Sequence, residues 1–310
     1  MTLILTSCTN RKRYQPEPYL DTLNLPRGTL EETASNWVSR RNKVSSHYEA
    51  GSLYVGRPMK DARNAAQQIN TSPYIISAGM GLISILDAIP SYNLTVQSKS
   101  QGSIQKKIIE PIRPMDWWRA LNTALDRKNP VAGLVKIHKR ELTLIACPEV
   151  YAQMISDDVL TLNDEDISTI RIFGPRTPEN FPVRFRNLIM PYDERFDGPD
   201  SPLPGTRTDY PQRVLLHFVK DILPGSSSRD DMTVHRESIE KRMKTMRRPA
   251  LIRRTPLNDE QIIHLIRNCW ETAEGKSSKM LRVLRDREKV ACEQGRFANL
   301  FKLAKERHSL

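Results

Sequence analysis

The sequence predicts an α/β fold with a mainly parallel sheet, followed by a separate helical module. Two observations support it: short apolar runs of strand length alternate with stretches of helical periodicity, and the C-terminal part has helical periodicity alone. The first run, Leu3–Leu5, breaks into the polar loop 6–10, which contains Ser7, Cys8 and Asn10. Open parallel sheets bind ligands at the carboxyl ends of their strands, so we expect the binding site here.

The elements follow in order. After the first strand, we expect strands at 73–77, 142–146, 169–173 and 186–190. We expect helices at about 30–40, 58–69, 115–127, 148–154 and 211–222. The second strand is followed by Gly79-Met80-Gly81, and such a pair of glycines permits a tight turn and a close approach of a ligand to the backbone.

Composition excludes several classes of protein. No apolar run approaches the roughly 20 residues of a membrane span, and no charged leader precedes the first strand, so we expect no membrane and no signal peptide. The four cysteines lie far apart without a C-x-x-C pair, which argues against a zinc ribbon, an iron–sulfur cluster and a disulfide scaffold. We therefore expect a cytoplasmic protein without metal or cofactor.

The net charge of +12 is unevenly distributed along the chain. Residues 241–310 hold 18 Lys/Arg and 8 Asp/Glu, whereas residues 1–240 hold 30 and 28. Such a basic tail indicates a polyanion partner, although a solvated helical extension would have a similar composition. Because 224–228 reads as a linker, we expect an α/β domain at 1–223, a basic linker at 224–256 and a helical module at 257–310.

The last module contains three segments of helical periodicity, and the pattern resembles a helix-turn-helix. We expect double-stranded DNA as its partner, and a helical module that docks onto protein is the alternative. The basic residues expected to contact DNA are Arg247, Arg248, Arg253, Arg254, Lys279, Arg282, Arg285 and Arg296. Near the first strand, Arg11, Lys12 and Arg13 are expected to bind phosphates beside the pocket.

Four motifs in the first hundred residues resemble one bacterial family. They are Ser7-Cys8 with Lys12, Leu53-Tyr54-Val55-Gly56 with Lys60 and Ala62-Arg63, Ile76–Leu82, and Ser91-Tyr92-Asn93. They resemble a domain of unknown function that begins with S-C-x-x-K and is similar to the uracil-glycosylase-like domain of archaeosine-synthase-type enzymes. With the basic helical tail, the chain resembles the anti-phage bacteriophage replication inhibitory glycosylase (Brig) family.

The resemblance implies a uracil-DNA-glycosylase-like fold and a set of site residues. Asn10 would activate water from the first loop, with Ser7 beside it, and a late loop would stabilise the departing base. Asp193 is our candidate in that late loop, unless it simply pairs with a neighbouring arginine. The base pocket would contain Cys8, Gly79, Met80, Gly81, Tyr92 and Asn93. The relatives have P-Y-D where this chain has S-Y-N, and the amide of Asn93 can hydrogen-bond a base edge but cannot act as a general base.

The function that this resemblance implies is base excision in antiviral defence. The enzyme would be a DNA glycosylase that hydrolyses the N-glycosidic bond of a modified base in phage DNA, such as glucosylated hydroxymethylcytosine, and leaves an abasic site. One alternative is a nucleobase-exchange or nucleoside-hydrolysing enzyme of the tRNA deazaguanine type. Another is a DNA-binding regulator without enzymatic activity.

Overall fold

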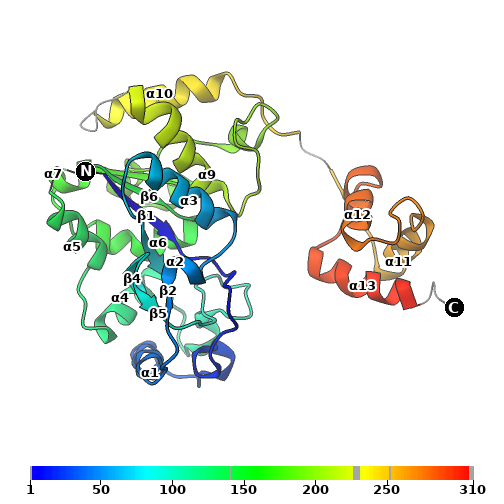
Figure 1. Cartoon of the computed structure of the whole chain (residues 1–310), viewed down its shortest axis with the longest axis horizontal. Helices are drawn as coiled ribbons and strands as arrows, with labels where there is room; N and C mark the ends of the chain where they lie inside the picture. Colours follow the sequence, from blue (N-terminus) through cyan, green and yellow to red (C-terminus); the bar gives the residue numbers. More distant parts are fainter. Residues whose placement is uncertain (1, 140, 226–230, 251–252, 307–310) are drawn as a thin grey trace. The chain divides into compact units, whose positions relative to one another are not determined.

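The computed structural model describes residues 2–139, 141–225, 231–250 and 253–306. The chain divides into two compact units, Met1–Pro249 and Ala250–Leu310, each with its own buried core (Figure 1). The strands of the first unit are β1 (Leu3–Ser7), β2 (Tyr48–Glu49), β3 (Tyr74–Ser77), β4 (Gly81–Ser84), β5 (Ala88–Ile89), β6 (Thr143–Ala146) and β7 (Ile170–Phe173). Its helices are α1 (Leu30–Asn42), α2 (Ala50–Leu53), α3 (Arg57–Gln68), α4 (Pro114–Ala124), α5 (Pro130–Ile137), α6 (Glu149–Val159), α7 (Asp164–Ser168), α8 (Val183–Arg186), α9 (Tyr210–His217) and α10 (Met232–Lys244).

The main sheet has five strands in the order β4-β3-β1-β6-β7. The pairs β3-β1, β1-β6 and β6-β7 are parallel, and β4 is an antiparallel edge strand, so the predicted mainly parallel sheet is confirmed. All five residues of β1 are buried because the sheet is covered on both faces. Side chains alternate across the strand: Leu3 and Leu5 pack with α1, α4 and α6, whereas Ile4 packs with α3 and α9 (Figure 1).

One expected strand is wrong, and the structure contains an edge strand that was not expected. The run 186–190 is not a fifth parallel strand: Pro182 starts the short helix α8, and Ile189 meets β7 only through an isolated bridge to Ile172. The chain after β3 forms β4 instead, because Gly81 has a φ of +74° and reverses the chain direction. The glycine pair 79–81 therefore makes a hairpin at the sheet edge.

The expected linker 224–256 is largely wrong, because most of it belongs to the first unit. Asp231 caps α10 by accepting a hydrogen bond from the backbone N–H of Thr233, and Ile239 and Met243 are fully buried against the same core as α9. The boundary between the units lies between Pro249 and Ala250 instead of at 223/224. Polar composition concealed this helix, since only one narrow face of it is apolar. Residues 226–230 lie outside the described residues.

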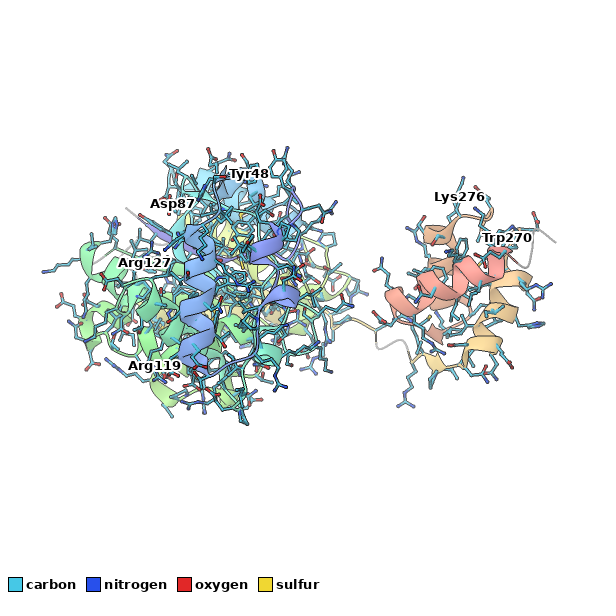
Figure 2. All side chains as sticks on the ribbon, turned by 90° about the horizontal axis from the view of Figure 1, so that it is seen from below. Tyr48, Asp87, Arg119, Arg127, Trp270 and Lys276 are labelled. Atoms are coloured by element: carbon cyan, nitrogen blue, oxygen red, sulfur yellow. The ribbon has the colours of Figure 1, made fainter. Side chains whose placement is uncertain are left out.

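The second unit contains the three expected helices, but it is not purely helical. They are α11 (Asp259–Asn268), α12 (Ser277–Arg282) and α13 (Gln294–Glu306), and β8 (Thr255–Pro256) pairs in parallel with β9 (Val290–Ala291). The helix α12 has six residues and continues as a π-helical turn. Trp270, labelled in Figure 2, stacks on Phe301 with the ring centroids 5.4 Å apart. Among the described residues, no helix is both long and apolar enough to cross a membrane.

We expect Gly174→Ala to destabilise the first unit. Gly174 follows β7 with a φ of +124°, and an added Cβ would lie 2.2 Å from the carbonyl oxygen of Cys147. The strained backbone and this overlap should lower the free energy of unfolding by about 2 kcal/mol or more, measured by urea denaturation. The control is Gly133→Ala inside α5, where an added Cβ meets nothing within 4 Å. The control should leave stability unchanged or raise it by about 0.5–1 kcal/mol, and an equal loss in both variants would contradict the expectation.

Candidate functional site

Three hydroxyl groups meet at the carboxyl edge of the sheet. Ser77 ends β3, and its Oγ lies 2.6 Å from the hydroxyl of Tyr92 and 3.3 Å from that of Tyr54, while the two tyrosine hydroxyls are 2.7 Å apart. The backbone N–H groups of Gly79 and Met80 also donate to Ser77 Oγ, at 3.3 and 3.0 Å. Both phenols are almost completely buried. Through these hydrogen bonds, Ser77 fixes the positions of the two tyrosine hydroxyls.

Lys12 lies over the rings of the two tyrosines. Its Nζ lies 4.0 Å from the ring centroid of Tyr92 and 5.6 Å from that of Tyr54. The backbone fixes the loop, because Lys12 and Tyr54 form an antiparallel bridge and the N–H of Val55 donates to the carbonyl of Arg11 at 3.1 Å. Lys12 is thus a cation–π partner of two buried phenols. Its expected role in binding phosphate beside the pocket stays a prediction.

Cys8 reaches the same place from the end of β1. Its Sγ lies 3.1 Å from the hydroxyl of Tyr151 on α6, and its backbone N–H donates to the carbonyl of Ile76 at 2.9 Å. The pairing of β1 with β3 therefore fixes where the Cys8 thiol lies along the direction of β3. We call Cys8, Lys12, Tyr54, Ser77, Tyr92 and Tyr151 the phenol cluster. It joins side chains from five separate segments of the chain.

Burial sets the protonation of the phenol cluster. It raises the pKa of Tyr54, Tyr92 and Tyr151, so these phenols remain neutral hydrogen-bond donors. Burial also lowers the pKa of Lys12, and the nearby Cys8 offsets part of this effect. The charged form of Lys12 is therefore held by aromatic faces, which stabilise an ammonium less well than a carboxylate would.

The two first-loop candidates lie differently from one another. Asn10 is exposed, beyond the end of β1. Ser7 is buried, and its Oγ accepts a hydrogen bond of 3.4 Å from Nε2 of Gln212 on α9, which also donates to Thr6 Oγ1 at 3.0 Å. Ser7 therefore ties β1 to α9, while Asn10 is free to face solvent.

The predicted base-pocket residues beside the phenol cluster serve its packing. An added Cβ on Gly79 would lie 2.7 Å from Tyr92 Cε2, and the Gly79 carbonyl accepts from Trp37 Nε1 at 2.7 Å. Met80 is fully buried behind them. The amide of Asn93 donates to Asp21 Oδ1 at 3.1 Å, so this amide braces the loop around Asp21.

The carboxylate of Asp193 is occupied by Arg195. It accepts from the backbone N–H and from Nε of Arg195 at 2.9–3.0 Å and caps the short helix Glu194–Asp197. Burial alone would raise the pKa of Asp193, but these hydrogen bonds outweigh burial and hold it below the usual range. The structure thus shows the ion pair that was the alternative to a catalytic role.

A buried ion-pair network fixes the late loop, and sequence reasoning missed it. The fully buried Arg213 on α9 binds Asp209 through Nε at 2.6 Å and Asp197 through Nη2 at 2.5 Å. Arg176, which follows β7, binds Asp197 and lies 3.6 Å over the ring centroid of Tyr210. Only Asp209 and Arg213 are an i, i+4 helical pair, so the other contacts had no local signal in the sequence.

Glu149 is a further carboxylate that sequence reasoning missed. It begins α6 just after β6, the strand paired with β1. Its carboxylate accepts from Thr177 Oγ1 and, at 2.8 Å, from Asn180 Nδ2. Since β1 leads to β3 on one side and lies beside β6 on the other, this edge is the switch point where open α/β sheets form a crevice. A carboxylate directly after a buried strand was the available signal.

A cavity of about 560 Å³ lies elsewhere, between α4, α5 and α6. Arg119 and Arg127, both labelled in Figure 2, are among its lining residues. Its buried carboxylate, Asp158, already accepts from Trp118 Nε1 at 2.9 Å and from the N–H groups at the start of α5. None of the four motifs contributes a lining residue to it, so we place the candidate site at the phenol cluster.

The basic residues expected to contact DNA differ in their availability. Arg247 and Arg248 lie in the first unit and pair with Asp200 and Glu194. Four residues of the second unit have partners within that unit: Arg254, Lys279, Arg285 and Arg296. Arg11, Arg13, Arg253 and Arg282 are exposed, and their side chains form no hydrogen bond or ion pair with another described residue. The first unit holds 35 Lys/Arg and 28 Asp/Glu and the second holds 13 and 8, so both units are basic.

Metal-binding potential is low in the part of the chain that the structure describes. His, Cys, Asp and Glu form no group of three or more there that could hold a metal ion. All four cysteines are buried and unpaired. The absence of a cofactor stays a prediction.

Comparison with known proteins gives no match: no protein-family model, no curated protein and no solved structure matches this chain. The functional argument therefore depends on the site itself.

We expect Lys12 to titrate below the ordinary lysine value of 10.5 in a side-chain NMR pH titration, because burial disfavours its charge. Cys8→Ala should lower the pKa of Lys12 further, since the electrostatic interaction with Cys8 raises it. Because the unfolded chain holds this proton more tightly, the contribution of Lys12 to the free energy of unfolding should rise with pH between the two pKa values. The control Cys269→Ala, in the second unit, should not move the titration. An upward shift in Cys8→Ala would refute this picture.

We expect Tyr92→Phe to lower the free energy of unfolding by about 1–2 kcal/mol, because it removes the hydroxyl shared by Tyr54 and Ser77 while keeping the ring. Thermal or urea denaturation measures the change. The control is Tyr19→Phe, whose side chain is 62% exposed and which should be neutral. Equal stability of Tyr92→Phe and the wild type would show that the hydroxyl contacts contribute nothing.

Proposed function

We propose that this chain is a DNA glycosylase with a uracil-DNA-glycosylase-like fold that hydrolyses the N-glycosidic bond of a modified base and leaves an abasic site. By its resemblance to the anti-phage glycosylases, the substrate is phage DNA with a modified base such as glucosylated hydroxymethylcytosine. One observation carries the proposal: all four motifs of the resemblance contribute a side chain or backbone group to the phenol cluster. Segments far apart in sequence thus converge on one place at the carboxyl edge.

The phenol cluster supports the departure of a base. Cleavage of an N-glycosidic bond leaves negative charge on the base and positive charge on the sugar. Neutral phenols and the ammonium of Lys12 are donors suited to the leaving base, and Asn10 at the exposed rim is suited to orient the attacking water. Glu149 follows β6, the strand that pairs with β1, and its carboxylate is suited to balance the sugar cation.

Access to a base in a duplex requires that the base leaves the stack, and this needs contacts to the backbone on either side. Arg11 and Arg13 flank Lys12 and are exposed, which suits them to phosphates next to the flipped base. The basic second unit, with Arg253 and Arg282 exposed, supplies sequence-independent attraction.

The decisive experiment incubates the full chain with modified and unmodified phage DNA and then treats both with alkali. We expect strand breaks only in the modified DNA, since alkali cleaves abasic sites. Lys12→Met should reduce base release by about 100-fold or more because the leaving base loses its charge partner. The control Lys136→Met, at an exposed position of α5, should retain activity.

Three outcomes would contradict the proposal. Intact DNA in both tubes would exclude base excision under these conditions. Release of base from a free nucleoside with equal efficiency would favour the nucleobase-exchange or nucleoside-hydrolase alternative. Tight binding to one defined DNA sequence without strand lability would favour a regulator.

Comparing Asn10→Ala with Glu149→Gln in the same assay separates the water-orienting role from charge stabilisation.

A further inference from the structure

A groove with a volume of about 500 Å³ lies along α3 and shares Tyr54 with the phenol cluster. Its cationic lining residues are Arg13, Lys60 and Arg63, and none of its described lining residues is a carboxylate. Tyr54 and Gly56 line it as well. Three cations without an acid form a site for an anion, since like charges repel one another until a counter-charge binds.

Arg63 is the lining residue that most clearly indicates a bound anion in this groove. Its Nε is buried and has no hydrogen-bond partner among the described residues. A buried guanidinium N–H without an acceptor is costly, and a bound oxyanion would relieve that cost. The helix α3 also begins at this groove, because its N-cap residue Gly56 is one of the lining residues. No side chain caps the first turn, and the positive end of the helix dipole adds to the positive charge there.

Another basic groove of the first unit, about 530 Å³ in volume, shows the contrast. Four of its five cationic lining residues already have partners: Arg236 donates to the carbonyl of Ile189 at 2.7 Å, Arg186 donates to backbone carbonyls, Arg195 is paired with Asp193 and Arg176 with Asp197. Their charges serve to hold the fold. The groove on α3 is therefore the better candidate for a ligand.

We propose that Arg13, Lys60 and Arg63 form a phosphate-binding site, and that Tyr54 connects this site to the phenol cluster. Tyr54 lines the groove and also donates to Ser77, so a ligand could contact both places at once. This inference rests on the proposed function: the phosphate belongs to the substrate whose base reaches the phenol cluster. A phosphodiester of a DNA strand and the phosphate of a mononucleotide share the required chemistry.

The test measures binding of pyrophosphate to the full-length chain by calorimetry. Arg63→Gln and Lys60→Gln should each weaken binding by about fivefold or more, as expected for the loss of a charged hydrogen bond. Lys136→Gln, with the same change of charge at an exposed position of α5, should bind as the wild type does. Because Lys60 is exposed, its variant should fold even if Arg63→Gln does not. Wild-type affinity in Lys60→Gln would overturn the site.

Competition against pyrophosphate identifies the source of the phosphate. Displacement by a short unmodified oligonucleotide without terminal phosphates supports a strand phosphodiester, and displacement by deoxycytidine monophosphate alone supports a nucleotide. Failure of both competitors overturns the assignment. The alkali assay reports separately on the proposed function: loss of pyrophosphate binding in the variants, with no base release from any DNA by the wild type, would keep the site and refute the glycosylase.

Discussion

The parallel pairing of β1 between β3 and β6 is the constraint on which the rest of the first unit depends. A strand buried on both faces must hydrogen-bond on both sides, and its chain can emerge only at the carboxyl edge. The loop after Ser7 is therefore delivered between the ends of two neighbouring strands. The backbone hydrogen bond of Cys8 to Ile76 and the bridge between Lys12 and Tyr54 place Cys8 and Lys12 in the phenol cluster.

The position of Lys12 over the aromatic rings of the phenol cluster is unfavourable for stability. A half-buried ammonium on an aromatic face gains about 2 kcal/mol from the cation–π interaction, while removing a charge from water costs several kcal/mol. A methionine at position 12 could pack against the same rings without that cost. The presence of a lysine there, among neutral phenols, is thus better explained by a functional site than by stability.

Sequence patterns predicted the sheet well and the site only in part. The strands β1, β3, β6 and β7 are short, mostly apolar and almost entirely buried, which is the pattern that periodicity detects best. The run 186–190 has the same apolar character but follows Pro182 and packs as a turn, and periodicity does not separate the two. The inward direction of Lys12 also had no local signal, because its aromatic partners Tyr54 and Tyr92 lie far along the chain.

The position of the unit boundary changes how the positive charge should be interpreted. When residues 241–249 are counted with the second unit, the first unit has a net charge close to zero. Any attraction for a polyanion would then be assigned to the second unit alone. With α10 in the first unit, the net charges are +7 and +5, and the first unit carries the larger share. Arg247 and Arg248 are paired with carboxylates, so that surplus must come from other residues. The groove of Arg13, Lys60 and Arg63 is one place where it is concentrated without a carboxylate, beside Tyr54. Under the proposed function, electrostatic attraction and the candidate chemistry therefore share a unit, and the second unit would add affinity without having to position the substrate.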